Sequence, residues 1–250
     1  MKEFKLDGRI AVITGASRGI GLACAQKLAK YGARCILVSR KAENLETAAR
    51  KIRESGGKAE AMACHTGYPD QIKAMYEKII EKYGTLDILV NNAATNPHFG
   101  EMLTADEGIW DKTLDVNLKG PFFMIKHAVP LMKDKGAIVN VASVNAVSPG
   151  LLQGVYSATK AALVNMTQTL SRELAPKGIR INSLLPGLTD TKFASAIISS
   201  DEICQHALSQ IPMGRYANPD EMAGAVLYLV SDAASFTTGA SLICDGGMLV

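Results

Sequence analysis

Short apolar runs alternate with longer amphipathic stretches along almost the whole chain. The runs have the length of strands, most are rich in Val, Ile or Leu, and they lie at residues 9–14, 34–39, 58–63, 86–90, 137–141, 179–185 and 241–244. Apolarity that is continuous rather than alternating is typical of strands covered on both faces. The pattern therefore predicts about seven strands of a parallel sheet.

The segments between these runs have helical spacing. Apolar side chains recur on one face of residues 19–31, and residues 41–54 and 69–83 repeat the pattern. Strands that alternate with helices predict right-handed crossovers with helices on both faces of the sheet. Because no linker or repeat interrupts the pattern, we expect residues 1–250 to form a single α/β domain with a Rossmann-like, doubly wound sheet. Ligands of such sheets bind at the carboxyl ends of the strands.

Composition and charge narrow the function classes. The chain has 250 residues, of which 48% are hydrophobic and 20% charged, and its net charge is only +3. Such a balance argues against a protein that binds nucleic acid through charge, and no apolar run approaches the roughly 18 residues that span a bilayer. Five scattered cysteines and four histidines contain no metal-ligand spacing. We expect a cytoplasmic protein without a metal, a membrane span or a nucleic-acid partner.

A glycine-rich turn follows the first strand and opens the first helix. Gly15, Gly19 and Gly21 form the pattern G-x-x-x-G-x-G. Glycine lets a backbone approach a ligand closely, and the amino end of a helix offers free N–H groups to a phosphate. By itself such a turn is often only a tight connection, but its place between strand and helix favours a dinucleotide site.

The end of the second strand favours NADP over NAD. Selectivity for NAD commonly uses an acidic side chain here, whereas this chain has Ser39 followed by Arg40, and Arg18 lies in the glycine turn. A guanidinium can bind the 2′-phosphate with two parallel hydrogen bonds. The alternative is that both arginines are solvated surface charges.

Tyr156 and Lys160 are four residues apart at the start of a predicted helix and therefore project from one side. An ammonium ~5 Å from a phenol would favour the phenolate by roughly 3 kcal/mol, about two pKa units. We therefore expect Tyr156 to act as a general acid and base. Ser143, just beyond a strand, could hold the reacting oxygen. Each residue alone has an ordinary structural explanation, and the combination carries the hypothesis.

The ordered set of motifs resembles the classical short-chain dehydrogenase/reductase family over essentially the whole chain. The motifs are the glycine turn, Asn91-Asn92-Ala93-Ala94, Asn117, Ser143, Tyr156-Ser157-Ala158-Thr159-Lys160, and Pro186-Gly187-Leu188-Thr189-Asp190-Thr191. The resemblance implies a catalytic set of Asn117, Ser143, Tyr156 and Lys160. It also implies that Lys160 contacts the nicotinamide ribose and that Asn117 holds a water of a proton relay.

Together the residues and the resemblance predict a surface for NADP(H) at the carboxyl edge of the sheet. The predicted cofactor-binding residues are Gly15, Ser17, Arg18, Gly19, Ile20, Gly21, Ser39, Arg40, His65, Thr66, Asn91, Ala93, Tyr156, Lys160, Pro186, Gly187, Thr189 and Thr191. The resemblance further implies a homotetramer, with residues 106–132 and 153–175 as helices at one interface and the C-terminal tail near another.

Three features are similar to the NADPH-dependent carbonyl/retinal reductase branch of the family: Cys64-His65, Ser39-Arg40-Lys41 and residues 96–100. This resemblance implies a small carbonyl or secondary-alcohol substrate. Bacterial 3-oxoacyl-(acyl-carrier-protein) reductases share most of the motifs, so reduction of an oxoacyl group stays an alternative, as does a non-catalytic nucleotide-binding subunit. Residues 192–213 are expected to form an apolar substrate lid. The ending Met248-Leu249-Val250 does not favour peroxisomal import.

Overall fold

The seven apolar runs form the seven strands of one parallel sheet, in the order β3-β2-β1-β4-β5-β6-β7. The computed structural model describes residues 2–133 and 135–250, and the predicted strand limits agree with the structure to within two residues. The strands are β1 (Ile10–Thr14), β2 (Arg34–Ser39), β3 (Lys58–Ala63), β4 (Ile88–Asn91), β5 (Ala137–Val141), β6 (Arg180–Pro186) and β7 (Ser241–Cys244). The predicted Rossmann-like α/β fold is confirmed.

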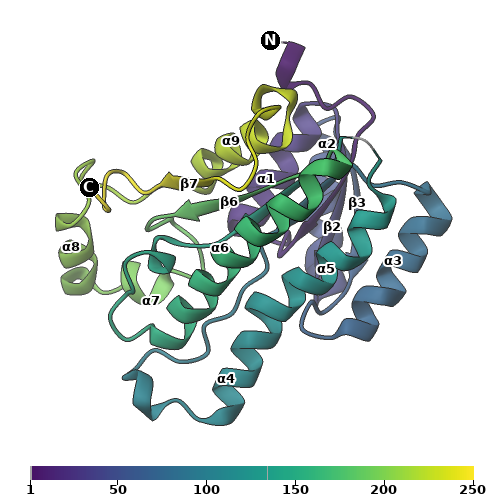
Figure 1. The fold of residues 1–250 in the computed structure, drawn as a ribbon. Coiled ribbons are helices and arrows are strands. Elements are labelled where there is room, and N and C mark those ends of the chain that lie inside the picture. Colours follow the sequence, from purple (N-terminus) through teal and green to yellow (C-terminus); the bar gives the residue numbers. More distant parts are fainter. Residues whose placement is uncertain (1, 134) are drawn as a thin grey trace.

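Helices cover both faces of the sheet (Figure 1). One face carries α1 (Gly19–Lys30), α2 (Ala42–Glu54) and α9 (Pro219–Val230). The other face carries α3 (Pro69–Tyr83), α5 (Gly120–Ala128) and α6 (Gly154–Leu174). The remaining helices are α4 (Glu107–Leu114), α7 (Ser195–Ile198) and α8 (Asp201–Ser209).

Strand β1 explains why the predicted strands are apolar without alternation. Ala11 and Ile13 are buried in the hydrophobic cluster beneath α1, α2 and α9. Ile10 and Val12 are buried in the opposite cluster, beneath α3, α5 and α6. Because successive side chains of a strand point to opposite faces, a strand between two helical layers needs apolar residues at every position.

The predicted helix over residues 106–132 is interrupted. A π-helical turn (Asp115–Lys119) separates α4 from α5, and Gly120 is the first residue of α5. A Cβ atom on Gly120 would lie 2.5 Å from the Thr66 carbonyl oxygen. Glycine is therefore required where α5 passes the loop that follows β3. The predicted helix over residues 153–175 forms α6, with one residue fewer at each end.

The strand order reverses between β1 and β4, and this switch point opens the carboxyl edge of the sheet to a ligand. Helices α7 and α8 lie beyond the carboxyl end of β6, outside the two helical layers (Figure 1). Within residues 2–133 and 135–250, no helix is both long and apolar enough to cross a membrane. In the same residues, no three His, Cys, Asp or Glu side chains are grouped to hold a metal ion.

Candidate active site

The carboxyl ends of β1 and β4 are tied together by Thr14 and Asn92. The Thr14 hydroxyl accepts hydrogen bonds from the backbone N–H groups of Asn92 and Ala93, both at 2.9 Å, and donates to the Val90 carbonyl. The Asn92 side chain donates to the Thr14 carbonyl at 2.9 Å. Sequence reasoning did not single out these two residues, although Thr14 ends an apolar strand and Asn92 lies within a recognised motif.

The glycine turn packs directly against Asn92, which joins the ends of β1 and β4. Gly15 and Gly19 have positive φ angles of 66° and 57°. A Cβ atom on Gly15 would lie 2.7 Å from Asn92 Nδ2, and one on Gly21 would lie 2.6 Å from the Gly15 carbonyl oxygen. Glycine is therefore obligatory at both places, because any side chain would push the turn away from the sheet.

The amino end of α1 is open to an anion. Arg18 precedes the helix, no side chain caps its first turn, and that turn contains no acidic residue. The first N–H groups of a helix carry a partial positive charge and need partners. A dinucleotide phosphate fits this end, with Ser17 and Ile20 half-buried beside the turn.

The ends of β2 and β3 bring Arg40 and His65 together. Burial and the nearby Arg40 guanidinium lower the pKa of His65. The His65 Nδ1 atom accepts a hydrogen bond from Gly67 N–H at 3.0 Å, so the neutral ring carries its proton on Nε2. Ser39 is half-buried, Arg40 is exposed and Thr66 is buried. A neutral His65 beside an exposed guanidinium suits the adenosine end of a dinucleotide.

The side chain of Asn91 is directed from the end of β4 toward β5. Its side chain is buried and donates to Asn140 Oδ1 at 2.9 Å, and Asn140 donates in turn to Thr167 Oγ1 at 2.9 Å. The two asparagines are directly paired in β4 and β5. The structure therefore uses Asn91 to join the sheet to α6, whereas Ala93 lies at the end of β4 beside Thr14.

The turn after β6 brings a second group of predicted residues to the same edge. Gly187 donates its N–H to the Cys244 carbonyl at 2.9 Å, directly after the last paired residue, Pro186. The buried Thr189 hydroxyl donates to the Gly187 carbonyl at 3.1 Å. The Thr191 methyl group lies 3.2 Å from the position of a Cβ atom on Gly19. The turn after β6 thus reaches the start of α1 at the glycine turn.

Three of the four predicted catalytic residues form one group, in which Tyr156 and Lys160 are buried and Ser143 is half-buried. Tyr156 is 7% exposed, and Ser143 lies close enough to its phenol to lower the pKa of that group. Lys160 is 2% exposed, its Nζ atom donates to the Val141 carbonyl at 2.8 Å, and the same atom lies 5.5 Å from the centre of the Tyr156 ring. The predicted spacing therefore brings the phenol, hydroxyl and amine together at the carboxyl end of β5.

The fourth residue, Asn117, belongs to the π-helical turn and is fully buried. It exchanges two hydrogen bonds with the Thr95 backbone, at 2.8 and 2.9 Å, and donates to Thr159 Oγ1 at 3.2 Å. Since Thr159 directly precedes Lys160, Asn117 links the loop after β4 to the part of α6 that carries the lysine. Thr95 and Thr159 are contacts that the sequence did not reveal.

Burial dominates the electrostatics of this group. It raises the pKa of Tyr156 to about 12, against a smaller lowering by the hydrogen bond with Ser143. It lowers the pKa of Lys160 to about 7. The expected acidification of the phenol by two pKa units does not appear in the chain by itself, because loss of solvation penalises phenolate and ammonium alike. Tyr156 therefore holds its proton at neutral pH, as a proton donor must.

Comparison with known proteins agrees with this geometry. The family model described as enoyl-(acyl carrier protein) reductase matches residues 15–249. The human dehydrogenase/reductase SDR family member 4 is 36% identical over 244 residues, which cover 97% of this chain and 88% of the relative. The chain belongs to the short-chain dehydrogenase/reductase family. The resemblance found in the sequence is confirmed, and the protein is an oxidoreductase of this family.

Other members of the short-chain dehydrogenase/reductase family are about equally similar. The 3-oxoacyl-(acyl-carrier-protein) reductase FabG of Thermotoga maritima is 36% identical over 248 residues, covering 98% of this chain and all of the relative. A crystal structure of a gluconate 5-dehydrogenase from Burkholderia cenocepacia J2315, in complex with NADP and tartrate, superposes with a TM-score of 0.93. It is 32% identical and covers 98% of this chain, which covers 97% of it.

Replacing Lys160 by Met is expected to change the pH dependence of stability. Between pH about 7 and 10.5 the unfolded chain holds the Lys160 proton and the folded protein does not, so this group makes the fold more stable as pH rises. Met keeps the length without the charge. The difference in unfolding free energy, variant minus wild type, should therefore fall by roughly 2 kcal/mol from pH 6 to pH 9.

Urea denaturation at the two pH values measures this difference. Lys177→Met, at an exposed position just after α6, controls for the loss of a surface lysine. An equal change in stability at pH 6 and pH 9 would contradict the burial argument.

Proposed function

We propose that the protein is an NADP(H)-dependent reductase that interconverts a carbonyl compound and its secondary alcohol. The observation that carries the proposal is the grouping of buried Tyr156 and Lys160 with half-buried Ser143 at the carboxyl edge of the sheet. A phenol that can donate a proton and a hydroxyl that can donate a hydrogen bond are the groups that stabilise a carbonyl oxygen while its carbon accepts a hydride, and the amine lies beside the phenol.

In the direction of reduction, the substrate oxygen accepts hydrogen bonds from Ser143 and Tyr156. Tyr156 then gives its proton to that oxygen as the carbonyl carbon is reduced. Lys160, held against the Val141 carbonyl, limits the cost of the negative charge left on Tyr156 and can return a proton to it. Asn117 keeps Thr159 and the start of α6 in position. Bound NADPH would supply the hydride.

The residues at the carboxyl edge fit this coenzyme. Gly15, Gly19 and Gly21 leave room for the pyrophosphate at the amino end of α1. Ser39 introduces no carboxylate beside the ribose, and Arg40 offers a guanidinium to the 2′-phosphate. Arg18 is a second exposed cation in the turn. The NADP in the related gluconate 5-dehydrogenase structure supports the same assignment.

A small ketone, dicarbonyl or retinoid is the proposed substrate class, with residues 192–213 as its lid. Support comes from the apolar side chains of that segment, three of which are exposed, namely Phe193, Ile203 and Met213. An apolar lid that closes over a substrate excludes water from hydride transfer. Reduction of a 3-oxoacyl thioester stays the second candidate, because the Thermotoga reductase is as similar as the human relative.

We also propose that the protein is located in the cytoplasm. All five cysteines are free, and four of them are buried. Free thiols are usual in reducing compartments, where NADPH-dependent reductases operate.

Replacing Tyr156 by Phe tests the proposed chemistry directly. The variant keeps the ring and loses the proton, so kcat for carbonyl reduction should fall by roughly 10²- to 10⁴-fold. Coenzyme binding, measured by fluorescence titration, should persist. Tyr31→Phe, at the far end of α1, is the matched control. Undiminished turnover in Tyr156→Phe would refute the role of the phenol, and NADPH binding without turnover in wild type, over a carbonyl panel, would favour a nucleotide-binding subunit.

Replacing Arg40 by Ala tests the coenzyme preference. Loss of the guanidinium should raise KM for NADPH by about 10- to 100-fold, because one charged hydrogen bond contributes roughly 1.5–3 kcal/mol. KM for NADH should change little. Arg50→Ala on α2, which removes an exposed pair with Glu54, controls for loss of a surface charge. Equal use of the two coenzymes by wild type would exclude NADP selectivity.

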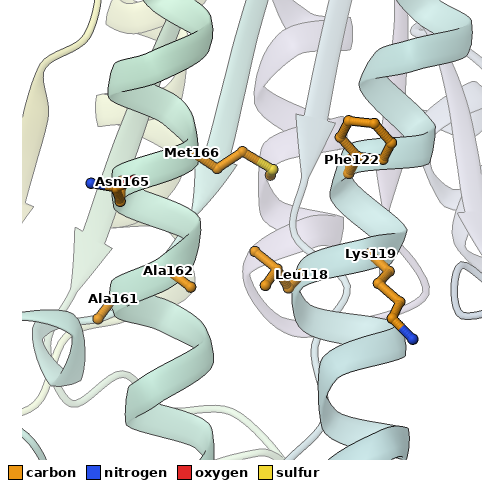
Figure 2. A pocket seen from close by; sticks show the side chains of 7 residues that line it. All are labelled: Leu118, Lys119, Phe122, Ala161, Ala162, Asn165 and Met166. Atoms are coloured by element: carbon orange, nitrogen blue, oxygen red, sulfur yellow. The ribbon is translucent and has the colours of Figure 1, made fainter.

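We further propose a homotetramer in which the α4–α5 segment and α6 form one interface. The support is a surface groove between these elements, lined by Leu118, Lys119, Phe122, Ala161, Ala162, Asn165 and Met166 (Figure 2). Met166 extends from α6 toward the side of the groove on which Phe122 lies (Figure 2). Analytical ultracentrifugation should give four times the mass of one chain, and Phe122→Glu should shift the protein to smaller species. A monomeric wild type would contradict this assembly.

A further inference from the structure

Phe193 places an aromatic ring directly against the proposed proton donor. Its ring centre lies 5.5 Å from that of Tyr156, with the two planes tilted by 45°. Tyr156 is 7% exposed whereas Phe193 is 49% exposed. The Phe193 ring therefore packs against Tyr156 and still leaves part of its own surface open to solvent.

The backbone holds Phe193 at this place. Before it, the Asp190 N–H donates to the Ala217 carbonyl at 2.8 Å, and the Ala217 N–H donates to the Leu188 carbonyl at 2.9 Å. After it, the Ala194 N–H donates to the Thr191 carbonyl at 3.0 Å. The ring thus projects from a turn that backbone hydrogen bonds hold in place, at the start of the proposed lid, residues 192–213.

The open part of the ring offers a flat apolar surface beside the proposed proton donor, Tyr156. Aromatic rings prefer offset or tilted contact with other flat groups, and such pairs contribute beyond the burial of apolar area. Further exposed apolar side chains, Val147 and Leu151, lie on the loop between Ser143 and α6. A substrate that covers the free ring would remove apolar surface from water.

We propose that Phe193 is a specificity-determining residue that receives a flat apolar substituent, an aryl group or a conjugated chain, attached to the substrate carbonyl. This inference rests on the proposed carbonyl-reductase function. It predicts that the enzyme distinguishes flat from saturated substituents of the same size. It also predicts that this distinction depends on the ring of Phe193 and not on its volume alone.

Acetophenone and cyclohexyl methyl ketone test the proposal, because they share a carbon skeleton and differ in the flatness of the ring. With NADPH in excess, kcat/KM is measured for both ketones in wild type, Phe193→Ala, Phe193→Leu and Phe193→Tyr. The ratio of the two kcat/KM values cancels effects on folding, coenzyme binding and the proton donor. We expect the ratio to fall about 10-fold in Phe193→Ala and in Phe193→Leu, and to persist in Phe193→Tyr.

Phe236→Ala is the matched control. Phe236 is a fully exposed phenylalanine next to Thr237, whose carbonyl accepts hydrogen bonds from Arg180, at the opposite end of β6 from the site. It should leave the ratio unchanged. If the ratio in Phe193→Ala equals that of wild type, even with both rates reduced, Phe193 covers the coenzyme or the tyrosine only and the inference is overturned. If wild type reduces no carbonyl compound with either coenzyme, the proposed function fails instead.

Discussion

Buried polar bonds between α6 and β5 hold the active site together. The Lys160 Nζ atom donates to the Val141 carbonyl, and two turns further along the helix Thr167 accepts from Asn140. These bonds cross a layer that is otherwise apolar, where an unpaired polar group would cost about 1–3 kcal/mol. They therefore allow one position of α6 over the sheet, and Tyr156 at the start of that helix takes its place from them.

The same burial decides the ionisation of the site. Without water, phenolate and ammonium are both unfavourable, so the pKa of Tyr156 rises and that of Lys160 falls. At neutral pH the site therefore contains a protonated phenol, Tyr156, beside a weakly basic amine, Lys160. A buried amine with a pKa of about 7 can gain or lose its proton near neutral pH at little cost, which suits a residue that resets the phenol after each reduction.

The strands and most helices could be predicted because their physical signals are local. The inner positions of residues 34–39 are all apolar because both faces of this strand are covered. The predicted limits of the run are the same as those of β2. The π-helical turn at Asp115–Lys119 has no such signal. It follows from the close passage of Gly120 past the Thr66 carbonyl, a contact between segments more than 50 residues apart in the chain. For the same reason the sequence did not reveal that the Asn91 side chain bonds to Asn140 across the β4–β5 pair.

The sequence by itself determined the family, the α/β alternation and the residue types that carry the chemistry, since spacing along one helix puts Tyr156 and Lys160 on one side. It also indicated the glycine turn, whose need for positive φ is a property of single residues. Only the tertiary structure decided how strongly these groups are desolvated, which side chains tie the loops together and which aromatic ring meets Tyr156. Desolvation and contact depend on the layers that surround a residue, and those layers come from distant parts of the chain.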